Sequence, residues 1–249
     1  MRLLQNIYPV ITDLPCVTTD QMIEVDRRMM EEVGISLFQM MENAGLQLAN
    51  VARDVFLGGD VMSKRIAVLA GTGGNGGGVI VAARRLVNWG AKCDVALSRT
   101  ADALSDVPRV QFEILNKIGN VDRIEPQDLA SGYDLILDGL IGYSLNGAPR
   151  GKVADFIDAT HSTATPVLSL DVPSGYDGAK GVVLDPCIRA ATTLTLGLPK
   201  LGMTGKDRSE YVGRLLCADI SCPSAVFADL GLNSPYRVPF SSQPVVEVG

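Results

Sequence analysis

Apolar residues recur at helical spacing in two stretches near the start of the chain. Both stretches open with a capping box, in which a Thr or Ser is followed three residues later by Gln (Thr18 with Gln21, Ser36 with Gln39). Gly34 separates them. The apolar positions are Met22, Val25, Met29 and Val33 in the first stretch, and Leu37, Met40, Met41, Ala44, Leu48 and Val51 in the second. The pattern predicts two amphipathic helices that cover a sheet or a partner subunit.

From Ile66 onward, short apolar runs alternate with glycine and polar residues, which is typical of alternating strands and helices. Strands are predicted at Ile66–Ala70, Asp94–Leu97, Asp134–Leu137, Val167–Leu170, Thr193–Leu196 and Leu215–Ala218. Helices are predicted near Val79–Trp89, Pro108–Lys117 and Val153–Thr160. The pattern indicates an α/β fold with a mostly parallel sheet. A loop alone joins the last two strands, which allows them to be antiparallel.

Length and composition fit one packed domain over residues 1–249. Apolar residues make up 47% of the 249 residues and charged residues 20%. The tail beyond Asn233, which contains Pro235, Pro239 and Pro244, is expected to be irregular. The net charge of -6 and the absence of a Lys/Arg run argue against nucleic acid as a partner.

The cysteines and the single histidine exclude several kinds of site. The five cysteines form no C-x-x-C pair and have no neighbouring His, so they are interpreted as reduced thiols of a cytoplasmic protein. His161 lies in a polar run, which favours a surface position over a catalytic triad. No signal-like or 18-residue apolar segment is present, so secretion and membrane insertion are disfavoured.

A glycine-rich loop lies between the first predicted strand of the sheet and the helix that follows. Six of the eight residues from Gly71 to Gly78 are glycine, more than a tight turn needs. Backbone N–H groups of such a loop can approach a phosphate at a helix N-terminus. The loop matches G-x-G-x-x-G but lacks the acidic residue of an NAD site, since the next strand ends at Arg99, which would tolerate an NADP phosphate. No Gly-Lys-Ser/Thr follows, so the loop is not a Walker A motif.

Polar residues follow two further strands at the point where each strand ends. Asp138 precedes Gly139, and Asp171 precedes Ser174 and Gly175. Because parallel strands end along one edge of a sheet, these residues and Asn75 are expected to meet in one crevice. Each has a simpler explanation as a loop cap, but together they favour a functional site.

Several motifs in one order resemble the YjeF N-terminal domain family, from about Thr18 to Ala228. They are Thr18-Thr19-Asp20-Gln21-Met22 with Asp26, Met41-Glu42-Asn43-Ala44-Gly45, the glycine loop running into Ala82-Ala83-Arg84, Asp138-Gly139-Leu140-Ile141-Gly142, Leu170-Asp171-Val172-Pro173-Ser174-Gly175 and Gly197-Leu198-Pro199-Lys200-Leu201-Gly202. The resemblance implies a Rossmann-like three-layer αβα sandwich, usually a homodimer. It also implies NAD(P)H-hydrate epimerase activity, which interconverts the R and S epimers of hydrated NADH and NADPH. The dehydratase domain that is fused to some members is not expected in this chain.

The resemblance also implies the roles of particular residues. Asn75, Asp138 and Ser174 would bind a potassium ion, one per subunit, and Asp171 would be catalytic. The substrate site would contain Gly74, Asn75, Gly76, Gly77, Gly78, Gly142, Tyr143, Ser144, Leu145, Asn146, Gly147, Ala148 and Asp171.

The glycine loop departs from the family pattern, which usually reads Gly-x-Gly-Asn-Asn-Gly-Gly-Asp-Gly. Gly74 replaces the first Asn, Gly78 replaces the Asp and Val79 replaces the last Gly. Asp171 is then expected to be the principal carboxylate near the chemistry. Lys200 is a second candidate for the proton relay, but it is expected to be a solvated turn residue.

Two alternatives of other classes stay open at this point. Gly78 favours a nucleotide-binding or scaffold member that has kept the fold and lost the reaction, whereas the retained Asn75, Asp138, Asp171 and Ser174 oppose it. An NADP-dependent oxidoreductase would rest on the glycine fingerprint and Arg99 alone.

Overall fold

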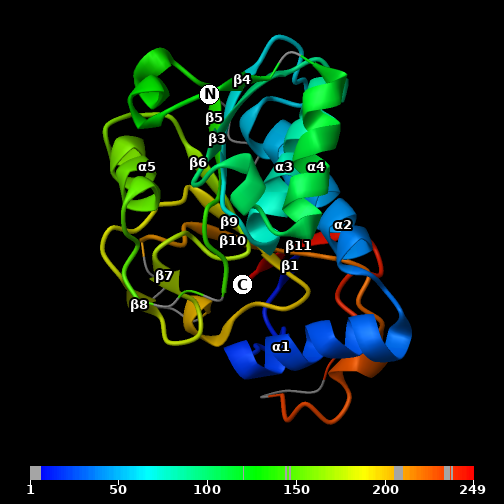
Figure 1. Cartoon of the computed structure of the whole chain (residues 1–249). Coiled ribbons are helices and arrows are strands. Elements are labelled where there is room, and N and C mark those ends of the chain that lie inside the picture. The colour runs from blue at the N-terminus through cyan, green and yellow to red at the C-terminus, as the bar shows by residue number, and fades with distance from the viewer. Residues whose placement is uncertain are drawn as a thin grey trace.

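A nine-stranded sheet forms the centre of the computed structural model, which describes residues 7–119, 121–143, 145, 147–204, 210–232, 236 and 238–249. The strand order is β1-β11-β10-β9-β6-β5-β2-β3-β4 (Figure 1). The strands are β1 (Val10–Ile11), β2 (Arg65–Ala70), β3 (Lys92–Leu97), β4 (Asp122–Arg123), β5 (Leu135–Gly139), β6 (Val167–Leu170), β9 (Thr192–Leu196), β10 (Arg214–Ala218) and β11 (Val245–Val248). A separate hairpin pairs β7 (Tyr176–Asp177) with β8 (Val182–Val183).

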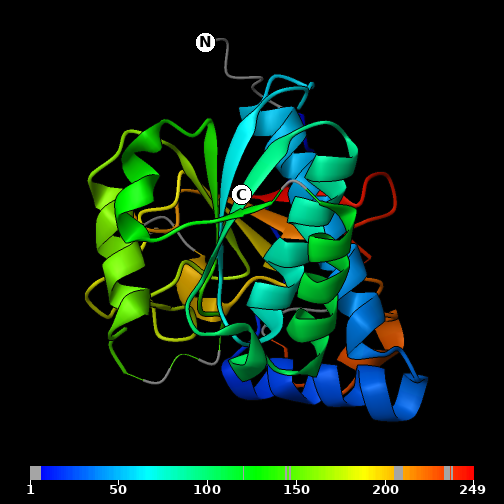
Figure 2. The same cartoon turned by 45° about the horizontal axis from the view of Figure 1, so that its top comes forward.

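Helices cover both faces of the sheet, so the predicted three-layer α/β architecture is confirmed. Figure 2 shows α2, α3 and α4 on one face and α5 on the other. The α-helices are α1 (Thr19–Arg28), α2 (Leu37–Val51), α3 (Gly74–Asn88), α4 (Asp106–Ile118) and α5 (Lys152–His161). Shorter 3-10 or π segments are η1 (Met29–Val33), η2 (Ala52–Phe56), η3 (Ala101–Ala103), η4 (Pro126–Ser131), η5 (Leu201–Met203) and η6 (Ser224–Phe227).

Strand β2 shows why the sheet is buried on both faces. Val68 belongs to the core beneath α2, α3 and α4, whereas Ala67 and Leu69 belong to the core beneath α5. Successive side chains of a strand point to opposite faces, so a continuous apolar run is needed where helices cover both.

Both predicted capping boxes are present at the N-termini of α1 and α2. The Gln21 N–H donates to Thr18 Oγ1 over 3.2 Å, and the Thr18 N–H donates to Gln21 Oε1 over 2.8 Å. Ser36 and Gln39 form the same reciprocal pair. Gly34 has φ 84°, which is a conformation that glycine adopts readily and which ends the first helical segment. Helix α1 then lies across the carboxyl edge of the sheet (Figure 1).

The suggested antiparallel pairing of the last two predicted strands is wrong. Strands β9 and β10 are parallel, with Thr192 beside Arg214 and Leu196 beside Ala218. The connection returns from the end of β9 to the start of β10 without an α-helix among its described residues, so the sequence lacked the usual sign of a parallel crossover.

The expectation of an irregular tail needs correction at its end. Val245–Val248 form β11, which pairs antiparallel with β10 and parallel with β1. Val245, Val246 and Val248 are buried, so apolar burial orders this segment directly after Pro244.

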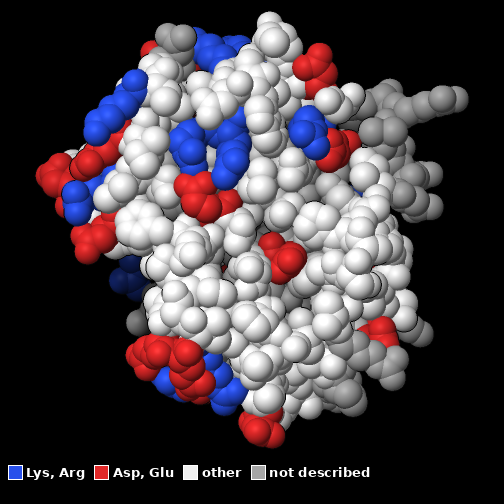
Figure 3. Space-filling view, turned by 90° about the vertical axis from the view of Figure 1, so that its right-hand side faces the viewer, with Lys and Arg blue, Asp and Glu red and all other residues white. Residues whose placement is uncertain are grey.

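Charges on the helical face of the molecule are mixed in sign. Figure 3 shows basic side chains beside acidic ones, without a continuous basic patch on this face. Among the described residues, no helix is long and apolar enough to cross a membrane.

Candidate functional site

The glycine loop combines close packing with an open surface. A Cβ on Gly71 would lie 2.0 Å from the Leu140 carbonyl oxygen, and one on Gly76 would lie 2.0 Å from the Gly71 carbonyl oxygen. Packing therefore requires these two glycines. Gly73 instead faces open space, a Cβ on Gly74 would make only an ordinary contact with Met41 at 3.9 Å, and the helix α3 begins at Gly74 without a side-chain cap. The first N–H groups of α3 are thus available to a ligand.

A pocket of about 690 Å³ opens in front of this loop at the carboxyl edge of the sheet. Gly74, Asn75 and Gly76 line it, as predicted, whereas Gly77 and Gly78 are buried behind it. Gly77 faces Pro108, and a Cβ on Gly78 would lie 2.4 Å from Leu170 Cδ2. These two predicted substrate residues therefore serve helix packing in this structure.

The predicted substrate segment after β5 is only partly at the pocket. Gly142 and Tyr143 line it, whereas Gly147 and Ala148 are exposed and Leu145 is half-buried. Ser144 and Asn146 lie outside the described residues. Gly142 is required because a Cβ there would lie 2.7 Å from Asn75 Oδ1.

Asp138 and Ser174 are joined directly, as their strand-end positions predicted. The Ser174 hydroxyl donates to Asp138 Oδ1 over 2.6 Å, and the Ser174 N–H donates to Asp138 Oδ2 over 2.9 Å. Ser169 Oγ and the Leu140 N–H also donate to this carboxylate. Asp138 is 0% exposed, and burial raises the pKa of its carboxyl, against which the Ser174, Ser169 and Leu140 hydrogen bonds act.

The Asn75 side chain joins the same cluster through hydrogen bonds to backbone carbonyl groups. Its side-chain amide donates to the Leu170 carbonyl over 2.7 Å and to the Ile141 carbonyl over 3.5 Å. The Ile141 N–H in turn donates to Ser174 Oγ over 2.9 Å. The three predicted potassium ligands therefore lie in one hydrogen-bonded cluster.

Asp171 directly follows β6 and has a backbone conformation that is uncommon for residues other than glycine. Its φ is 67°, in the left-handed region, and its N–H donates to the Leu194 carbonyl over 2.7 Å. Asp171 Oδ1 accepts from the Leu196 N–H over 3.2 Å and from Thr195 Oγ1 over 3.3 Å. The neighbouring strand β9 thus holds the carboxylate at the pocket wall.

The expectation that Lys200 is a solvated turn residue is wrong. Lys200 is 1% exposed, and its Nζ forms an ion pair with Asp171 Oδ1. Nζ also donates to Thr195 Oγ1 over 3.2 Å and to the Leu196 carbonyl over 3.3 Å. A buried ammonium needs such a set of partners, because an unpaired buried charge is costly. The turn brings Lys200 to the sheet edge, which the local sequence does not reveal.

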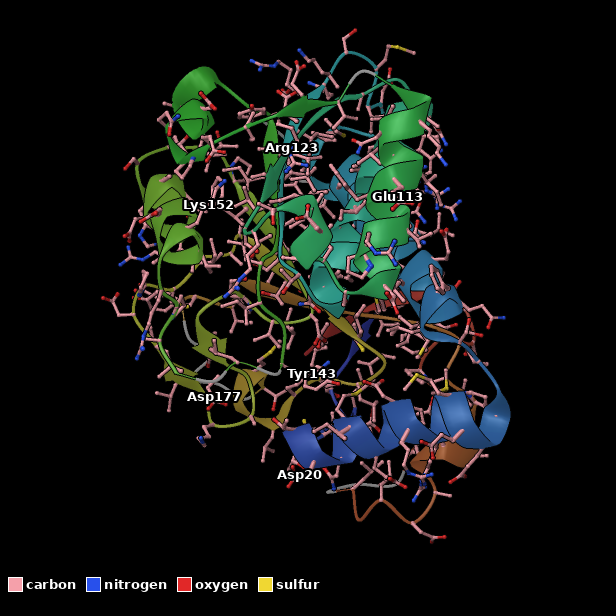
Figure 4. The ribbon with its side chains drawn as sticks, in the orientation of Figure 1. Asp20, Glu113, Arg123, Tyr143, Lys152 and Asp177 are labelled. Atoms are coloured by element: carbon pink, nitrogen blue, oxygen red, sulfur yellow. The ribbon has the colours of Figure 1, made fainter. Side chains whose placement is uncertain are left out.

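A second carboxylate, Asp26 of α1, lies at the same pocket and was not predicted as a site residue. The Tyr143 hydroxyl donates to Asp26 Oδ2 over 2.7 Å. In Figure 4, Tyr143 lies between the carboxyl edge of the sheet and α1. The signal in the sequence was an acid four residues after the buried Met22 and three before the buried Met29, on the apolar side of an amphipathic helix.

The cations of the pocket differ in what they contact. Arg27 pairs with Glu24, Glu31 and Glu32, and Lys200 pairs with Asp171. Arg99, which follows β3, is exposed and forms no ion pair with any residue that the structure describes. It is thus available to an anionic group of a ligand.

The cysteines and His161 behave as the sequence indicated. None of the five cysteines, all of which the structure describes, forms a disulfide bond, and four are buried. His161 is exposed and its Nε2 lies 3.0 Å from the Cys187 carbonyl oxygen. Within the described ranges, no group of three or more His, Cys, Asp or Glu side chains could hold a metal ion.

The α/β fold with a glycine loop and polar strand ends at one sheet edge defines a nucleotide-binding class of protein. Comparison with known proteins is more specific. Residues 37–202 match the family described as YjeF-related protein N-terminus. The chain therefore belongs to this family.

Curated relatives are similar over most of the chain. An NAD(P)H-hydrate epimerase of Dehalogenimonas lykanthroporepellens is 41% identical over 226 residues, which cover 90% of this chain and 89% of the relative. An epimerase of Truepera radiovictrix is 35% identical, with 83% of this chain and 89% of the relative covered. The bifunctional NAD(P)H-hydrate repair enzyme Nnr of Moorella thermoacetica is 33% identical over 87% of this chain and 42% of its own length.

A solved structure confirms the fold. The yeast protein YNL200c superposes with a TM-score of 0.79 at 24% identity, covering 94% of this chain and all of that one.

Proposed function

We propose that this protein is an NAD(P)H-hydrate epimerase, which interconverts the R and S epimers of hydrated NADH and NADPH. Family membership and the similarity to the Dehalogenimonas and Truepera epimerases support this function. The observation that carries it is one pocket that combines the open N-terminus of α3 with the buried Asp171–Lys200 pair. The first group suits a pyrophosphate, and the second suits proton transfer.

The reaction requires inversion at a carbinolamine carbon, which carries a hydroxyl and is bonded to the ring nitrogen. The hydroxyl leaves as the ring nitrogen supplies its lone pair, and a hydroxyl is added again at the other face of the ring. In our proposal, Asp171 relays a proton to or from this oxygen. Asp171 Oδ2 accepts no hydrogen bond from the described residues, so this oxygen is available to the substrate.

We also propose that Asn75, Asp138 and Ser174 hold a potassium ion. Carboxylate, amide and hydroxyl oxygens suit a hard cation. No Lys or Arg in the described part of the chain pairs with the buried Asp138, so a cation would compensate its charge. All four lone-pair positions of Asp138 are used, but the Ser174 hydroxyl could donate instead to the Ile141 carbonyl, 3.3 Å away, and so free one. When bound, the ion would supply positive charge beside the phosphate-binding loop.

A homodimer is part of the proposal. Exposed apolar side chains on α1, η1 and the start of α2 support it, namely Ile23, Met30, Val33 and Phe38. Light scattering at micromolar concentration should give the mass of two chains, and a clean monomer would contradict it. The free cysteines support a cytoplasmic location.

A binding or scaffold member of the family is the second candidate, favoured by Gly78 in place of the family's acid. One assay separates the two. Purified R-epimer of hydrated NADH is incubated with the protein in potassium or sodium buffer, and the S-epimer is followed by chromatography. Acceleration that depends on potassium supports the epimerase and its ion. Binding of the hydrate without acceleration would support the scaffold.

A further inference from the structure

Asp26 and Asp171 reach the pocket from different elements and have different partners. Asp26 comes from α1, which lies across the sheet edge (Figure 1), whereas Asp171 directly follows β6. Asp171 is the ionised partner of Lys200. Asp26 forms no ion pair with any described residue, and its carboxylate accepts a hydrogen bond from the Tyr143 hydroxyl. The pocket therefore offers one carboxylate that is paired with an ammonium group and one that has no cationic partner among the described residues.

The surroundings of Asp26 raise the pKa of its carboxyl. Burial raises the pKa of the Asp26 carboxyl above its ordinary value, and nearby Asp171 raises it further. The Tyr143 hydrogen bond and Lys200 act in the opposite direction without cancelling the rise. The Cys222 thiol is a further titratable neighbour, and burial raises its pKa to about 12, so it stays neutral. Enzymes use two carboxyl groups whose surroundings separate their pKa values as acid and base.

Inversion at a carbinolamine carbon needs proton transfer at two positions. On one face of the ring, the C–O bond breaks, its electron pair stays on oxygen and an acid protonates that oxygen to give water. The ring-nitrogen lone pair then forms a C=N bond. On the other face, water adds to this carbon, the C=N π pair returns to nitrogen and a base removes a proton from the added water. A single carboxylate on one face would have to serve both positions.

We propose that Asp26 is a second catalytic acid–base residue, which works with Asp171 from the opposite face of the substrate ring, and that Tyr143 positions it. This inference rests on the proposed epimerase function. In one direction, Asp26 donates the proton and Asp171 accepts one, and in the reverse direction the roles are exchanged. The oxygen that leaves is then not the oxygen that returns.

The test compares Asp26→Asn with Asp20→Asn, an exposed acid on the same helix that does not line the pocket. Exchange of hydrated NADH is measured in both directions in H₂¹⁸O, with binding of NADPH as a probe of the pocket and thermal unfolding as a probe of the fold. We expect Asp26→Asn to slow exchange by about 10²-fold. Asp20→Asn should match the wild type, and each inversion by the wild type should introduce one ¹⁸O.

Tyr143→Phe keeps the Asp26 carboxyl and provides a second readout. Because the Tyr143 hydrogen bond lowers the pKa of Asp26, its loss should raise that pKa. In the direction in which Asp26 donates, activity should then fall at a higher pH than in the wild type. A merely structural role of Tyr143 would leave the pH profile in place.

The outcomes separate this inference from the proposed function. If the wild type is active, any of three results would overturn the two-residue mechanism. They are an Asp26→Asn variant with unimpaired exchange, a Tyr143→Phe variant with an unshifted pH profile, and inversion without incorporation of ¹⁸O. If Asp26→Asn fails to fold, Asp26→Glu is measured in its place. This variant is expected to keep most of the wild-type exchange rate. A wild type without any acceleration would overturn the proposed function itself.

Discussion

Asp138 and Asp171 both lie near the carboxyl ends of the adjacent strands β5 and β6, yet their surroundings differ. Asp138 accepts four hydrogen bonds from Leu140, Ser169 and Ser174 and is fully buried. The Oδ1 atom of Asp171 faces Lys200, Thr195 and Leu196, while its Oδ2 is left for the pocket. A strand-end carboxylate thus serves architecture when protein donors use all its lone pairs, and chemistry when one oxygen stays free.

The largest effect is expected from replacing Asp171, the carboxylate with a free oxygen. Asp171→Asn should slow epimer exchange by at least about 10²-fold, because the proton relay is lost. It should also lower the free energy of unfolding by about 3–5 kcal/mol, because the buried Lys200 ammonium loses its partner. Exchange is measured by chromatography, and stability by urea unfolding.

The double variant Asp171→Asn/Lys200→Met is the matched control for that change. It removes both charges, so stability should recover while the exchange rate stays low. A double variant as unstable as the single one would contradict the ion-pair account.

On the architectural side, Asp138→Asn should destabilise the fold by more than about 3 kcal/mol. The new amide would place a donor against the Ser174 and Ser169 donors, and hydrogen bonds to a charged group contribute about 1.5–3 kcal/mol each. Asp155→Asn, an exposed acid on α5, is the control. If Asp138→Asn unfolds at the same urea concentration as the wild type, the hydrogen bonds to Asp138 contribute little to the stability of the fold.

Gly78→Asp tests the family acid that this chain lacks. The new Cβ would meet Leu170 Cδ2 at 2.4 Å, so the variant should lose about 1–3 kcal/mol of stability through overpacking. Adding Leu170→Ala should relieve the contact, and urea unfolding of both variants measures it. A Gly78→Asp variant as stable as the wild type would mean that Leu170 moves aside at no cost.

The smallest expected effect concerns Arg99. If its guanidinium contacts the 2′-phosphate, Arg99→Ala should lower kcat/KM for hydrated NADPH about fivefold relative to hydrated NADH, since an exposed ion pair contributes up to about 1 kcal/mol. The ratio of the two values, measured at low salt, is the readout. An unchanged ratio would place the phosphate elsewhere.

The sequence predicted the parts of the molecule that depend on local patterns. Buried apolar runs located β2, β5 and β6, and the parallel arrangement then brought Asp138 and Ser174 to one edge. The capping boxes at Thr18 and Ser36 likewise gave the helix starts.

Long-range contacts explain what was missed. Lys200 follows a proline in a turn and is typical of an exposed residue, but the parallel pairing of β9 and β10 encloses it beside Asp171. Asp26 became a site residue only because α1 lies across the sheet edge and meets Tyr143. Neither contact has a sequence pattern of its own.

The account's central claim is that this pocket inverts the hydrated nicotinamide ring. The most direct measurement is the rate at which pure R-epimer of hydrated NADH becomes S-epimer with wild-type protein in potassium buffer, compared with the uncatalysed rate and with Asp171→Asn. We predict clear acceleration by the wild type and a loss of about 10²-fold or more in the variant. Equal rates with and without the wild-type protein would contradict the claim.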